Sequence, residues 1–252
     1  MVNFSLEGKI ALITGASRGI GESIAETLAA NGAHCILASR KIETLEEVVA
    51  KIKGKGGSAE AIPCNMGYLD QIKELMETIK SKHGRLDILV NNAAANPYFG
   101  EMINAEEWAW DKINDVNLKA PFFLTQAAAL MMKESGGGTV VNVSSINGVR
   151  PALFQGIYSV TKAALTCMTQ AFAKELAPFN IRVNALLPGL TDTKFSSAIT
   201  ANEDIKNMVV SQIPVQRVAQ PDEMAGAVLF LVSEASSYTT GSCITCDGGM
   251  LA

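Results

Sequence analysis

The chain is 252 residues long, which is enough for one large α/β domain or two smaller ones. Hydrophobic residues make up 48% of it and charged residues only 18%, a composition that supports a large core and excludes general disorder. The net charge of −4 disfavours a nucleic-acid partner, because phosphates are bound by clustered lysines and arginines.

Short apolar runs alternate with longer helical patterns along the whole chain. Runs typical of buried strands lie at 9–14, 34–39, 59–64, 86–91, 139–144, 181–187 and 242–247. Helical patterns lie between them, at about 20–31, 41–54, 68–83, 105–134, 156–177 and 221–234. This alternation predicts an α/β fold in one domain over 1–252, a doubly wound, seven-stranded parallel sheet with helices on both faces. The long connection at about 190–215 reads as irregular, which is typical of a substrate lid.

The sequence gives no sign of a membrane or secretory segment. No apolar run approaches the roughly 20 residues that span a bilayer. The N-terminal MVNFSLEGK lacks the charged-then-apolar order of a secretory signal, and the C-terminal GGMLA is not a peroxisomal tripeptide. We therefore expect a cytoplasmic protein with no membrane partner.

Cysteine and histidine usage disfavours metal and redox chemistry. The five cysteines are scattered and odd in number, which suits a reducing compartment. Cys243 and Cys246 form C-x-x-C inside an apparent strand, where their side chains should point to opposite faces. The only two histidines, His34 and His83, have no other ligand type near them at metal spacing. We therefore expect no metal site and no serine–histidine triad.

A glycine-rich turn follows the first strand. TGASRGIG carries Gly15, Gly19 and Gly21 just before a helical pattern. Glycines let the backbone turn sharply and approach a pyrophosphate at the helix N-terminus. Its G-x3-G-x-G spacing differs from G-x-G-x-x-G, and such a turn can also be purely structural. Its place after the first strand of a doubly wound sheet favours dinucleotide binding.

The end of the second strand bears on the choice of dinucleotide. An NAD site would place an acidic residue there to accept from the ribose 2′-hydroxyl. This chain instead has Ser39, Arg40 and Lys41, and Arg18 lies within the glycine turn. Guanidinium and ammonium groups suit a 2′-phosphate, so the sequence predicts NADP, used as NADPH. The alternative is a solvated basic start to the second helix.

The stretch YSVTK places Tyr158 four residues before Lys162, on one face of a helix. A tyrosine keeps its proton until about pH 10, but a nearby ammonium favours the phenolate. Alone, the pair is also explained by a packed tyrosine beside a solvated lysine.

With TGASRGIG, Asn91-Asn92-Ala93, Asn117, Ser144-Ser145 and YSVTK in this order, the chain resembles the short-chain dehydrogenases/reductases over essentially its whole length. The resemblance implies a hydride transfer between a nicotinamide and a carbonyl or alcohol, with Asn117, Ser145, Tyr158 and Lys162 as catalytic residues. The family serine lies thirteen residues before the tyrosine, which selects Ser145 over Ser144. Ser145 would orient the substrate oxygen, Tyr158 would exchange its proton, and Lys162 would stabilise the phenolate and hold the nicotinamide ribose.

In the family, the main-chain carbonyl of the residue matching Asn117 holds a water that relays protons to the lysine. A helical carbonyl normally accepts from the N–H four residues on, and here that residue is Pro121, which has none. A helix running through 117–121 would therefore leave this carbonyl free and bend at the proline. The alternative is a break, with Pro121 starting a new helix.

The resemblance also implies a cofactor site along one edge of the sheet. Asn65 replaces the usual aspartate after the third strand, Ala94 a glycine, and Thr191 a branched apolar residue. The implied cofactor-binding residues are Gly15, Ser17, Arg18, Gly19, Ile20, Gly21, Ser39, Arg40, Lys41, Asn65, Met66, Asn91, Ala93, Tyr158, Lys162, Pro188, Gly189, Thr191 and Thr193.

The segment NAAAN-PYFG at 92–100 looks most like a branch of NADPH-dependent carbonyl and retinal reductases. It predicts an apolar ketone or aldehyde as substrate, in a pocket walled by this segment and the lid. The candidate substrate residues are Asn96, Tyr98, Phe99, Asn147, Gln155, Leu190 and Phe195, each of which ordinary core or lid packing also explains.

Two other functions remain open. A 3-oxoacyl-acyl-carrier-protein (or CoA) reductase would tend to carry basic residues before the fifth and sixth strands, where this chain has Lys133-Glu134-Ser135-Gly136 and Pro178-Phe179-Asn180. A catalytically silent NADP sensor would typically have lost a catalytic residue, and none is lost. The helical patterns at 105–134 and 156–177 are apolar on more than one face, and with the resemblance they predict a homotetramer.

Overall fold

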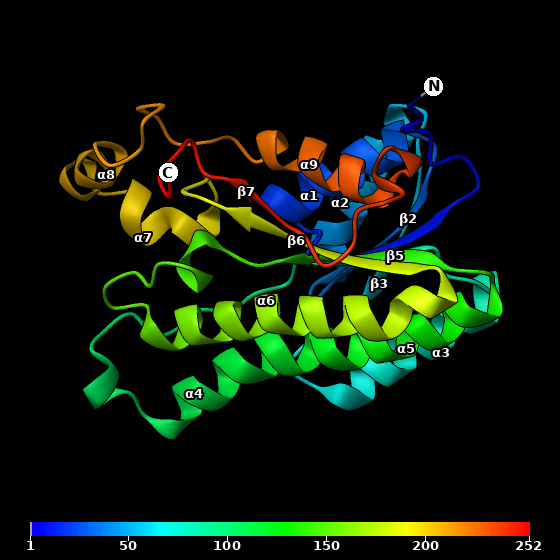
Figure 1. Ribbon diagram of the computed structural model, residues 1–252, viewed down its shortest axis with the longest axis horizontal. Coiled ribbons are helices and arrows are strands. Elements are labelled where there is room, and N and C mark those ends of the chain that lie inside the picture. Colours follow the sequence, from blue (N-terminus) through cyan, green and yellow to red (C-terminus); the bar gives the residue numbers. More distant parts are fainter. Residues whose placement is uncertain (1) are drawn as a thin grey trace.

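Seven parallel strands form one sheet in the computed structural model of the chain, which describes residues 2–252 (Figure 1). The strands run in the order β3-β2-β1-β4-β5-β6-β7, so the connection reverses direction between β1 and β4. Ligands of open α/β sheets bind at the carboxyl ends of the strands beside such a reversal. The strand bounds are β1 Ile10–Thr14, β2 His34–Ser39, β3 Ser58–Pro63, β4 Ile88–Asn91, β5 Gly138–Val143, β6 Ile181–Pro188 and β7 Cys243–Cys246. The predicted α/β fold and its seven strands are confirmed.

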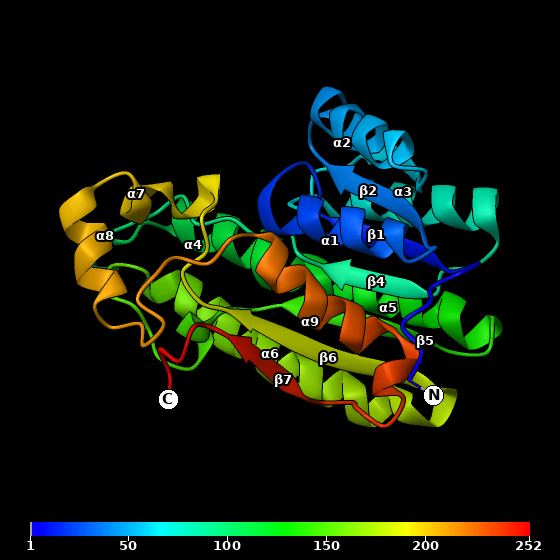
Figure 2. The ribbon, with the colours of Figure 1, turned by 90° about the horizontal axis from the view of Figure 1, so that it is seen from above.

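Helices cover both faces of this sheet and create two cores (Figure 2). One face is packed by α1 (Gly19–Ala30), α2 (Ile42–Gly54) and α9 (Asp222–Val232). The other is packed by α3 (Leu69–His83), α5 (Ala120–Glu134) and α6 (Gly156–Leu176). Because both faces are buried, strands such as β1 and β2 are apolar at nearly every position. Within the described residues, no helix has the length and apolar content to cross a membrane.

The helical pattern predicted at 105–134 forms three consecutive segments. Helix α4 spans Glu107–Asn114, a π-helical turn spans Asp115–Lys119, and α5 follows at once. The backbone remains right-handed helical through the junctions, so Pro121 does not begin a separate helix after a break. A π-turn adds a residue to one helical turn, and here it comes immediately before the proline that would clash with a regular one.

The expectation of an irregular 190–215 connection was wrong. It contains a 3₁₀ turn at Lys194–Ser196 and two short helices, α7 (Ser197–Thr200) and α8 (Glu203–Val210). Thr193 and Ser196 form a reciprocal capping box, and the Asn202 side chain accepts from the main chain of Asp204 and Ile205. These caps start helices too short to show an apolar period. Figure 2 shows α7 and α8 beyond the carboxyl ends of the strands.

Candidate active site

The four predicted catalytic residues come from three segments that meet beside the carboxyl end of β5. Ser145 follows β5 and caps a 3₁₀ turn at Ile146–Gly148, Tyr158 and Lys162 lie one turn apart on α6, and Asn117 lies in the π-turn. All four are buried: Asn117 is 0% exposed and Lys162 2%. The ammonium of Lys162 lies 5.5 Å from the centre of the Tyr158 ring.

Tyr158 is protonated over a wide pH range in the unliganded protein. Burial raises the pKa of its phenol to about 12, and hydrogen bonding with the Ser145 hydroxyl acts in the opposite direction. The Phe195 ring of the 190–215 segment packs 5.6 Å away, centre to centre, and helps to exclude water. To exchange a proton near neutral pH, this tyrosine needs more positive charge beside it than the unliganded site supplies.

Lys162 is a buried amine without an acidic partner. Its Nζ donates to the main-chain oxygen of Val143 at 2.8 Å, and among residues 2–252 it forms no ion pair. Burial lowers the pKa of this amine to about 7. The Ser144 hydroxyl donates to the Lys162 carbonyl at 2.9 Å, so Ser144 fixes the helix while Ser145 faces the tyrosine. The two adjacent serines therefore make different contacts, and only Ser145 lies beside the Tyr158 hydroxyl.

The side chain of Asn117 ties the segment after β4 to α6. Its Oδ1 accepts from the Ala95 N–H at 2.7 Å, and its Nδ2 donates to the Ala95 carbonyl at 2.9 Å and to Thr161 Oγ1 at 3.2 Å. These contacts use both N–H groups of the carboxamide and one acceptor site of Oδ1, so the side chain is held in place between the two segments. Pro121 has no N–H to offer the main-chain carbonyl of Asn117, so the regular partner four residues on is absent, while the π-turn itself is held by bonds between residues five apart, such as Ala120 N–H to the Asp115 carbonyl.

Asn92, which the sequence prediction missed, stabilises the glycine turn through hydrogen bonds. The Asn92 amide donates to the carbonyls of Thr14 and Gly15, at 2.9 and 3.2 Å. The Thr14 hydroxyl accepts from the N–H groups of Asn92 and Ala93, both at 3.0 Å. A Cβ on Gly21 would lie 2.4 Å from the Asn92 amide, so no other residue fits there. The result is a cradle that fits a pyrophosphate at the N-terminus of α1.

Asn91, predicted to bind the cofactor, points its side chain into the core instead. Its Nδ2 donates to Thr125 Oγ1 at 3.1 Å and to Asn142 Oδ1 at 2.9 Å, and the side chain is 2% exposed. Only its main chain can meet a cofactor. The adjacent pair Asn91-Asn92 was the sequence signal that could have identified Asn92. At a strand end, adjacent side chains point to opposite sides, so one faces the core and the other faces the glycine turn.

Three cations lie at the edge where an adenosine ribose would sit. Arg18 precedes α1, and Arg40 and Lys41 connect β2 to α2; all three are exposed. Within residues 2–252 their side chains have no hydrogen-bond or ion-pair partner, whereas Lys51 and Lys55, at the C-terminal end of α2, pair with Glu22 and Glu26. β1 and β2 are adjacent, so the two turns meet at one edge. The end of β2 therefore carries basic side chains at the place where an NAD site would have an acidic one.

The remaining predicted cofactor residues border the same cleft. The Asn65 Oδ1 accepts from the Gly67 N–H at 3.1 Å, which forms a tight turn after β3. Across the cleft, Thr191 is buried and donates to the Gly189 carbonyl, and the Thr193 methyl would touch a Cβ on Gly19 at 3.1 Å. The segment after β6 therefore closes toward the glycine turn. Ser17, Ile20, Ser39, Met66, Ala93 and Pro188 lie in or beside these connections.

The candidate substrate residues divide into a polar group and an apolar rim. The amides of Asn96 and Asn147 both donate to Gln155 Oε1 at 3.4 Å, which brings the three predicted polar anchors together. Phe99 and Phe195 are about half exposed, and Leu190 is half-buried.

Tyr98 differs from the other candidates. Its hydroxyl donates to the Glu101 carbonyl at 2.6 Å, and its ring packs on Ala109, Ile113 and Ile157. It supports the loop and does not offer its hydroxyl to a substrate.

Phe154 belongs to the apolar rim and was missed. It has a φ of 65°, an uncommon conformation for a bulky side chain that tends to occur at functional sites. Its ring lies 5.9 Å from that of Phe99, centre to centre, and its carbonyl accepts from the Gly100 N–H at 3.0 Å. Leu153 beside it is 78% exposed. The only sequence signal was an apolar pair inside a loop, PALFQG, next to the catalytic helix.

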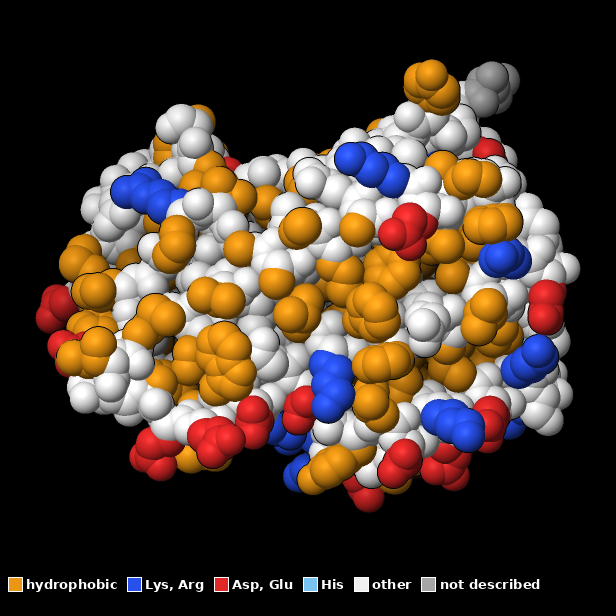
Figure 3. Space-filling view, turned by 60° about the horizontal axis from the view of Figure 1, so that its bottom comes forward, with side chains coloured by type: hydrophobic (Ala, Val, Ile, Leu, Met, Phe, Trp, Pro, Cys, Tyr) orange, Lys and Arg blue, Asp and Glu red, His pale blue; other side chains and the backbone are white. Residues whose placement is uncertain are grey.

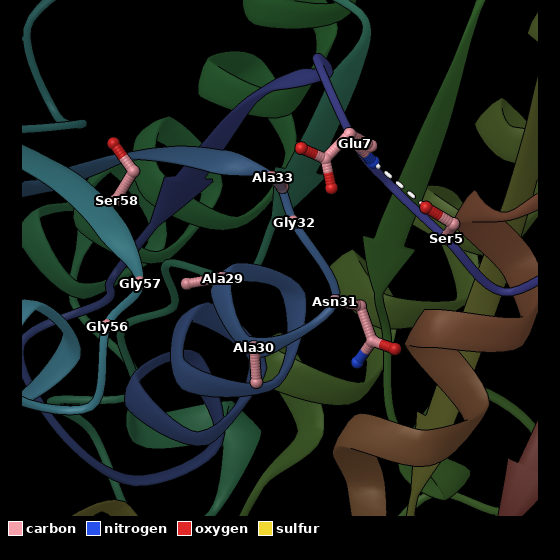
Figure 4. A pocket seen from close by; sticks show the side chains of 10 residues that line it. All are labelled: Ser5, Glu7, Ala29, Ala30, Asn31, Gly32, Ala33, Gly56, Gly57 and Ser58. Atoms are coloured by element: carbon pink, nitrogen blue, oxygen red, sulfur yellow. Dashed lines mark hydrogen bonds between the residues drawn. The ribbon is translucent and has the colours of Figure 1, made fainter.

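A separate hollow lies near the amino ends of the strands, away from the catalytic residues (Figure 4). It is lined mainly by glycines and other small residues, and Glu7 is its only titratable side chain. The Glu7 N–H donates to Ser5 Oγ at 3.3 Å. With no nucleophile or proton-transfer pair, this hollow does not compete with the cleft as an active site. Its lining residues are Ser5, Glu7, Ala29, Ala30, Asn31, Gly32, Ala33, Gly56, Gly57 and Ser58.

The sequence matches the family described as enoyl-(acyl carrier protein) reductase over residues 15–251. It is 42% identical over 244 residues to dehydrogenase/reductase SDR family member 4 of Sus scrofa, covering 97% of this chain and 88% of that protein. The fold resembles 7α-hydroxysteroid dehydrogenase complexed with NADH and 7-oxo glycochenodeoxycholic acid, with a TM-score of 0.94, 32% identity and coverage of 98% and 96%. It also resembles NADP-bound 3-oxoacyl-(acyl-carrier-protein) reductase of Agrobacterium tumefaciens C58, with a TM-score of 0.92, 34% identity and coverage of 97% and 95%. The chain belongs to the short-chain dehydrogenase/reductase family of oxidoreductases, which bind a nicotinamide cofactor.

Proposed function

We propose that the protein is an NADP-dependent reductase of apolar ketones or aldehydes, and oxidises the corresponding alcohols in reverse. The observation that carries the cofactor choice is the set of unpaired cations, Arg18, Arg40 and Lys41, at the edge of the glycine cradle. A 2′-phosphate would pair with them, whereas a bare 2′-hydroxyl would leave them without an acceptor. Solved relatives hold NADH in one case and NADP in another, so the family alone does not decide between them.

The side chains of the cleft divide the work of a carbonyl reduction. The bound nicotinamide supplies the hydride. Tyr158 gives its proton to the substrate oxygen, and Ser145 donates a hydrogen bond to the same oxygen as negative charge develops there. Lys162, one helical turn from Tyr158, stabilises the phenolate that is left. The main-chain carbonyl of Asn117 holds the water through which Lys162 is connected to solvent.

The substrate is proposed to be apolar because of the rim around the tyrosine. Exposed Phe99, Leu153, Phe154, Phe195 and Met208 come from the three connections that follow β4, β5 and β6 at this end of the sheet, with Met208 in helix α8. Exposed apolar side chains gathered around a few polar groups are typical of a small-molecule site. Asn147 and Gln155 offer those polar groups.

The acyl-carrier alternative has weaker support. An acidic carrier needs a basic docking surface. Lys133 lies over the Phe179 ring, 3.6 Å from its centre, and neighbouring Glu134 pairs with Lys80. The charged side chains of Lys133 and Glu134 are therefore both engaged in contacts within the chain, which leaves little positive charge to bind an acidic carrier. A silent NADP sensor is disfavoured because all four catalytic residues are present and gathered.

Steady-state kinetics with NADPH and NADH test the proposal. The panel comprises diketones, aromatic ketones, retinal and acetoacetyl thioesters, each at pH 7. We expect turnover of the apolar ketones or aldehydes, with a kcat/KM for NADPH at least tenfold above that for NADH. Equal use of the two cofactors would refute the NADP assignment, and turnover of the thioesters alone would favour the acyl-carrier function.

We further propose that four copies assemble. Exposed apolar side chains line α5 and α6, including Phe122, Phe123, Leu130 and Val160, and Figure 3 shows hydrophobic patches over one face of the molecule. A patch of this kind on a soluble enzyme is typically covered by a partner. Light scattering at micromolar concentration should give a mass near four times 26.7 kDa. We expect this assembly in the cytoplasm, where five free thiols are stable.

A further inference from the structure

The only two histidines of the chain meet at the end of the sheet opposite the catalytic cleft. His34 opens β2, His83 closes α3, and Glu60 of β3 lies between them. Glu60 Oε1 is 2.6 Å from His83 Nε2 and 3.8 Å from His34 Nε2, and the three ligand atoms lie within 4.8 Å of one another. The expectation that neither histidine lies near another ligand type was therefore wrong, because β2, β3 and α3 bring distant positions together.

His34 has a ring nitrogen with no partner. Its Nδ1 lies 2.7 Å from Ser58 Oγ, while its Nε2 is buried and has no hydrogen-bond partner among residues 2–252. Donation from Nδ1 to Ser58 leaves a lone pair on Nε2; the other tautomer would bury an N–H without an acceptor. Burial, reinforced by His83 and opposed by Glu60, lowers the pKa of His34, so the ring is neutral at pH 7. The ring therefore presents an available lone pair to the cluster.

Glu60 supplies the negative charge of the cluster. Burial alone would raise its pKa, but hydrogen bonds from His83 and Lys82 keep it below the usual value, so the carboxylate is ionised. Lys82 occupies Oε2 at 2.9 Å and leaves Oε1 on the side of the two rings. One oxygen is thus held by an outer hydrogen bond while the other faces both histidines.

We propose that His34, Glu60 and His83 bind a divalent transition-metal ion, with Zn²⁺ as the best fit. Two imidazoles and one carboxylate form a known three-ligand zinc set, with water in the fourth position. Ligand atoms about 2.1 Å from a tetrahedral ion lie roughly 3.4 Å apart. The observed separations fall on both sides of that value, so small side-chain rotations complete the site.

Binding replaces the hydrogen bond between His83 and Glu60 with bonds from both residues to the ion. A neutral His83 ring binds the ion through Nε2 when its one ring proton lies on Nδ1, so the ion takes the place of the hydrogen bond between Nε2 and Glu60 Oε1. Ser58 on His34 Nδ1 and Lys82 on Glu60 Oε2 remain as outer hydrogen bonds that orient two ligands. Positive charges of Lys53 and Lys82 oppose a dication, so we expect them to weaken its binding.

The site would join three elements at one sheet edge. β3 is the edge strand, and its Glu60 would be linked to β2 through His34 and to α3 through His83. The catalytic residues lie at the opposite, carboxyl ends of the strands. The expected effect is therefore on the thermal midpoint, with no effect on turnover.

The test uses the full chain without a polyhistidine tag, freed of metal with a chelator that is then removed. Calorimetric titration with ZnCl₂ should show one ion per chain. Because the chain has two histidines, carbon-13-labelled histidine gives two ring signals, and both should shift on addition of Zn²⁺. His34→Ala, Glu60→Gln and His83→Gln should each weaken binding at least tenfold.

A Cys243→Ser, Cys246→Ser double variant is the matched control, because C-x-x-C is the main rival zinc ligand in the chain. It should bind Zn²⁺ as the parent does. Loss of binding in this control, unshifted histidine signals with Zn²⁺ in excess, or parental affinity in a His34→Ala, His83→Gln variant would each overturn the proposal. Circular dichroism in chelator shows that each variant is folded, and His83→Gln, at a helix end, is the variant least able to disturb the fold.

Discussion

Replacing Lys162 with methionine should make the unliganded protein more stable while abolishing its activity. The amine is 2% exposed, has no acidic partner among residues 2–252, and has a pKa of about 7 because of burial, against an ordinary 10.5. Between pH 7 and 10.5 the unfolded chain binds a proton here that the folded chain has released. Stability therefore rises with pH across that window and is lowest at pH 7 and below.

The size of this effect on stability follows from the difference between the pKa of Lys162 in the folded chain and its pKa in the unfolded chain. At about 1.4 kcal/mol per pH unit, burial of Lys162 costs up to about 5 kcal/mol at pH 7 and about 1.4 kcal/mol at pH 9.5. Methionine has a similar length and needs no proton, but it leaves the Val143 carbonyl without its donor, at about 1–3 kcal/mol. The net gain should be on the order of 3 kcal/mol at pH 7 and close to zero at pH 9.5.

Urea unfolding of the cofactor-free protein at the two pH values measures this difference. A gain of about 3 kcal/mol corresponds to a rise in Tm of about 6–12 °C. Lys174→Met is the matched control, because Lys174 is an exposed lysine on the same helix, and it should change stability by less than about 0.5 kcal/mol at either pH. If Lys162→Met is less stable than the parent at pH 7, or if its advantage does not shrink by pH 9.5, the reasoning is wrong.

Three other variants test the cleft by steady-state kinetics. Arg40→Asp should erase the preference for NADPH, a change of roughly ten- to a hundredfold in the kcat/KM ratio, because it replaces a phosphate partner with a like charge; an unchanged ratio would exclude Arg40. Pro121→Ala restores an N–H that can compete for the Asn117 carbonyl, so kcat should fall several-fold with little change in the KM for NADPH, and an unchanged kcat would argue against the relay. Phe154→Gly should remove the positive-φ strain and raise the KM for apolar ketones at least several-fold. Leu229→Gly on α9, away from the rim, is the control and should not change this KM. An unaltered KM in Phe154→Gly would remove that residue from the substrate rim.

The strands were predictable because a sheet buried on both faces needs apolar residues at nearly every strand position. Each predicted run falls within about two residues of the observed strand, including the short β4 and β7. Helices α7 and α8 were not predictable in this way. Four to eight residues are too few to establish a helical period of apolar residues, and the starts of this segment's helices depend on caps at Thr193 and Asn202.

Residues of the site were predictable where a motif ties spacing to one element. Tyr158 and Lys162 share a helix, so their relation survives folding. Tyr98 and Asn91 were assigned by position along the chain, but tertiary contacts turned one toward Ala109 and Ile113 and the other into the core. Pairings across 23 or more positions, such as Glu60 with His83, leave no local trace in the sequence.

The clamp that Asn92 and Thr14 place under the glycine turn has a consequence for the rate of cofactor capture. Four hydrogen bonds already hold this turn in the unliganded protein. A pyrophosphate then meets donors that need no rearrangement, and little conformational entropy is lost at the protein's side of the contact. Cofactor capture should accordingly follow a single kinetic phase whose rate is proportional to cofactor concentration.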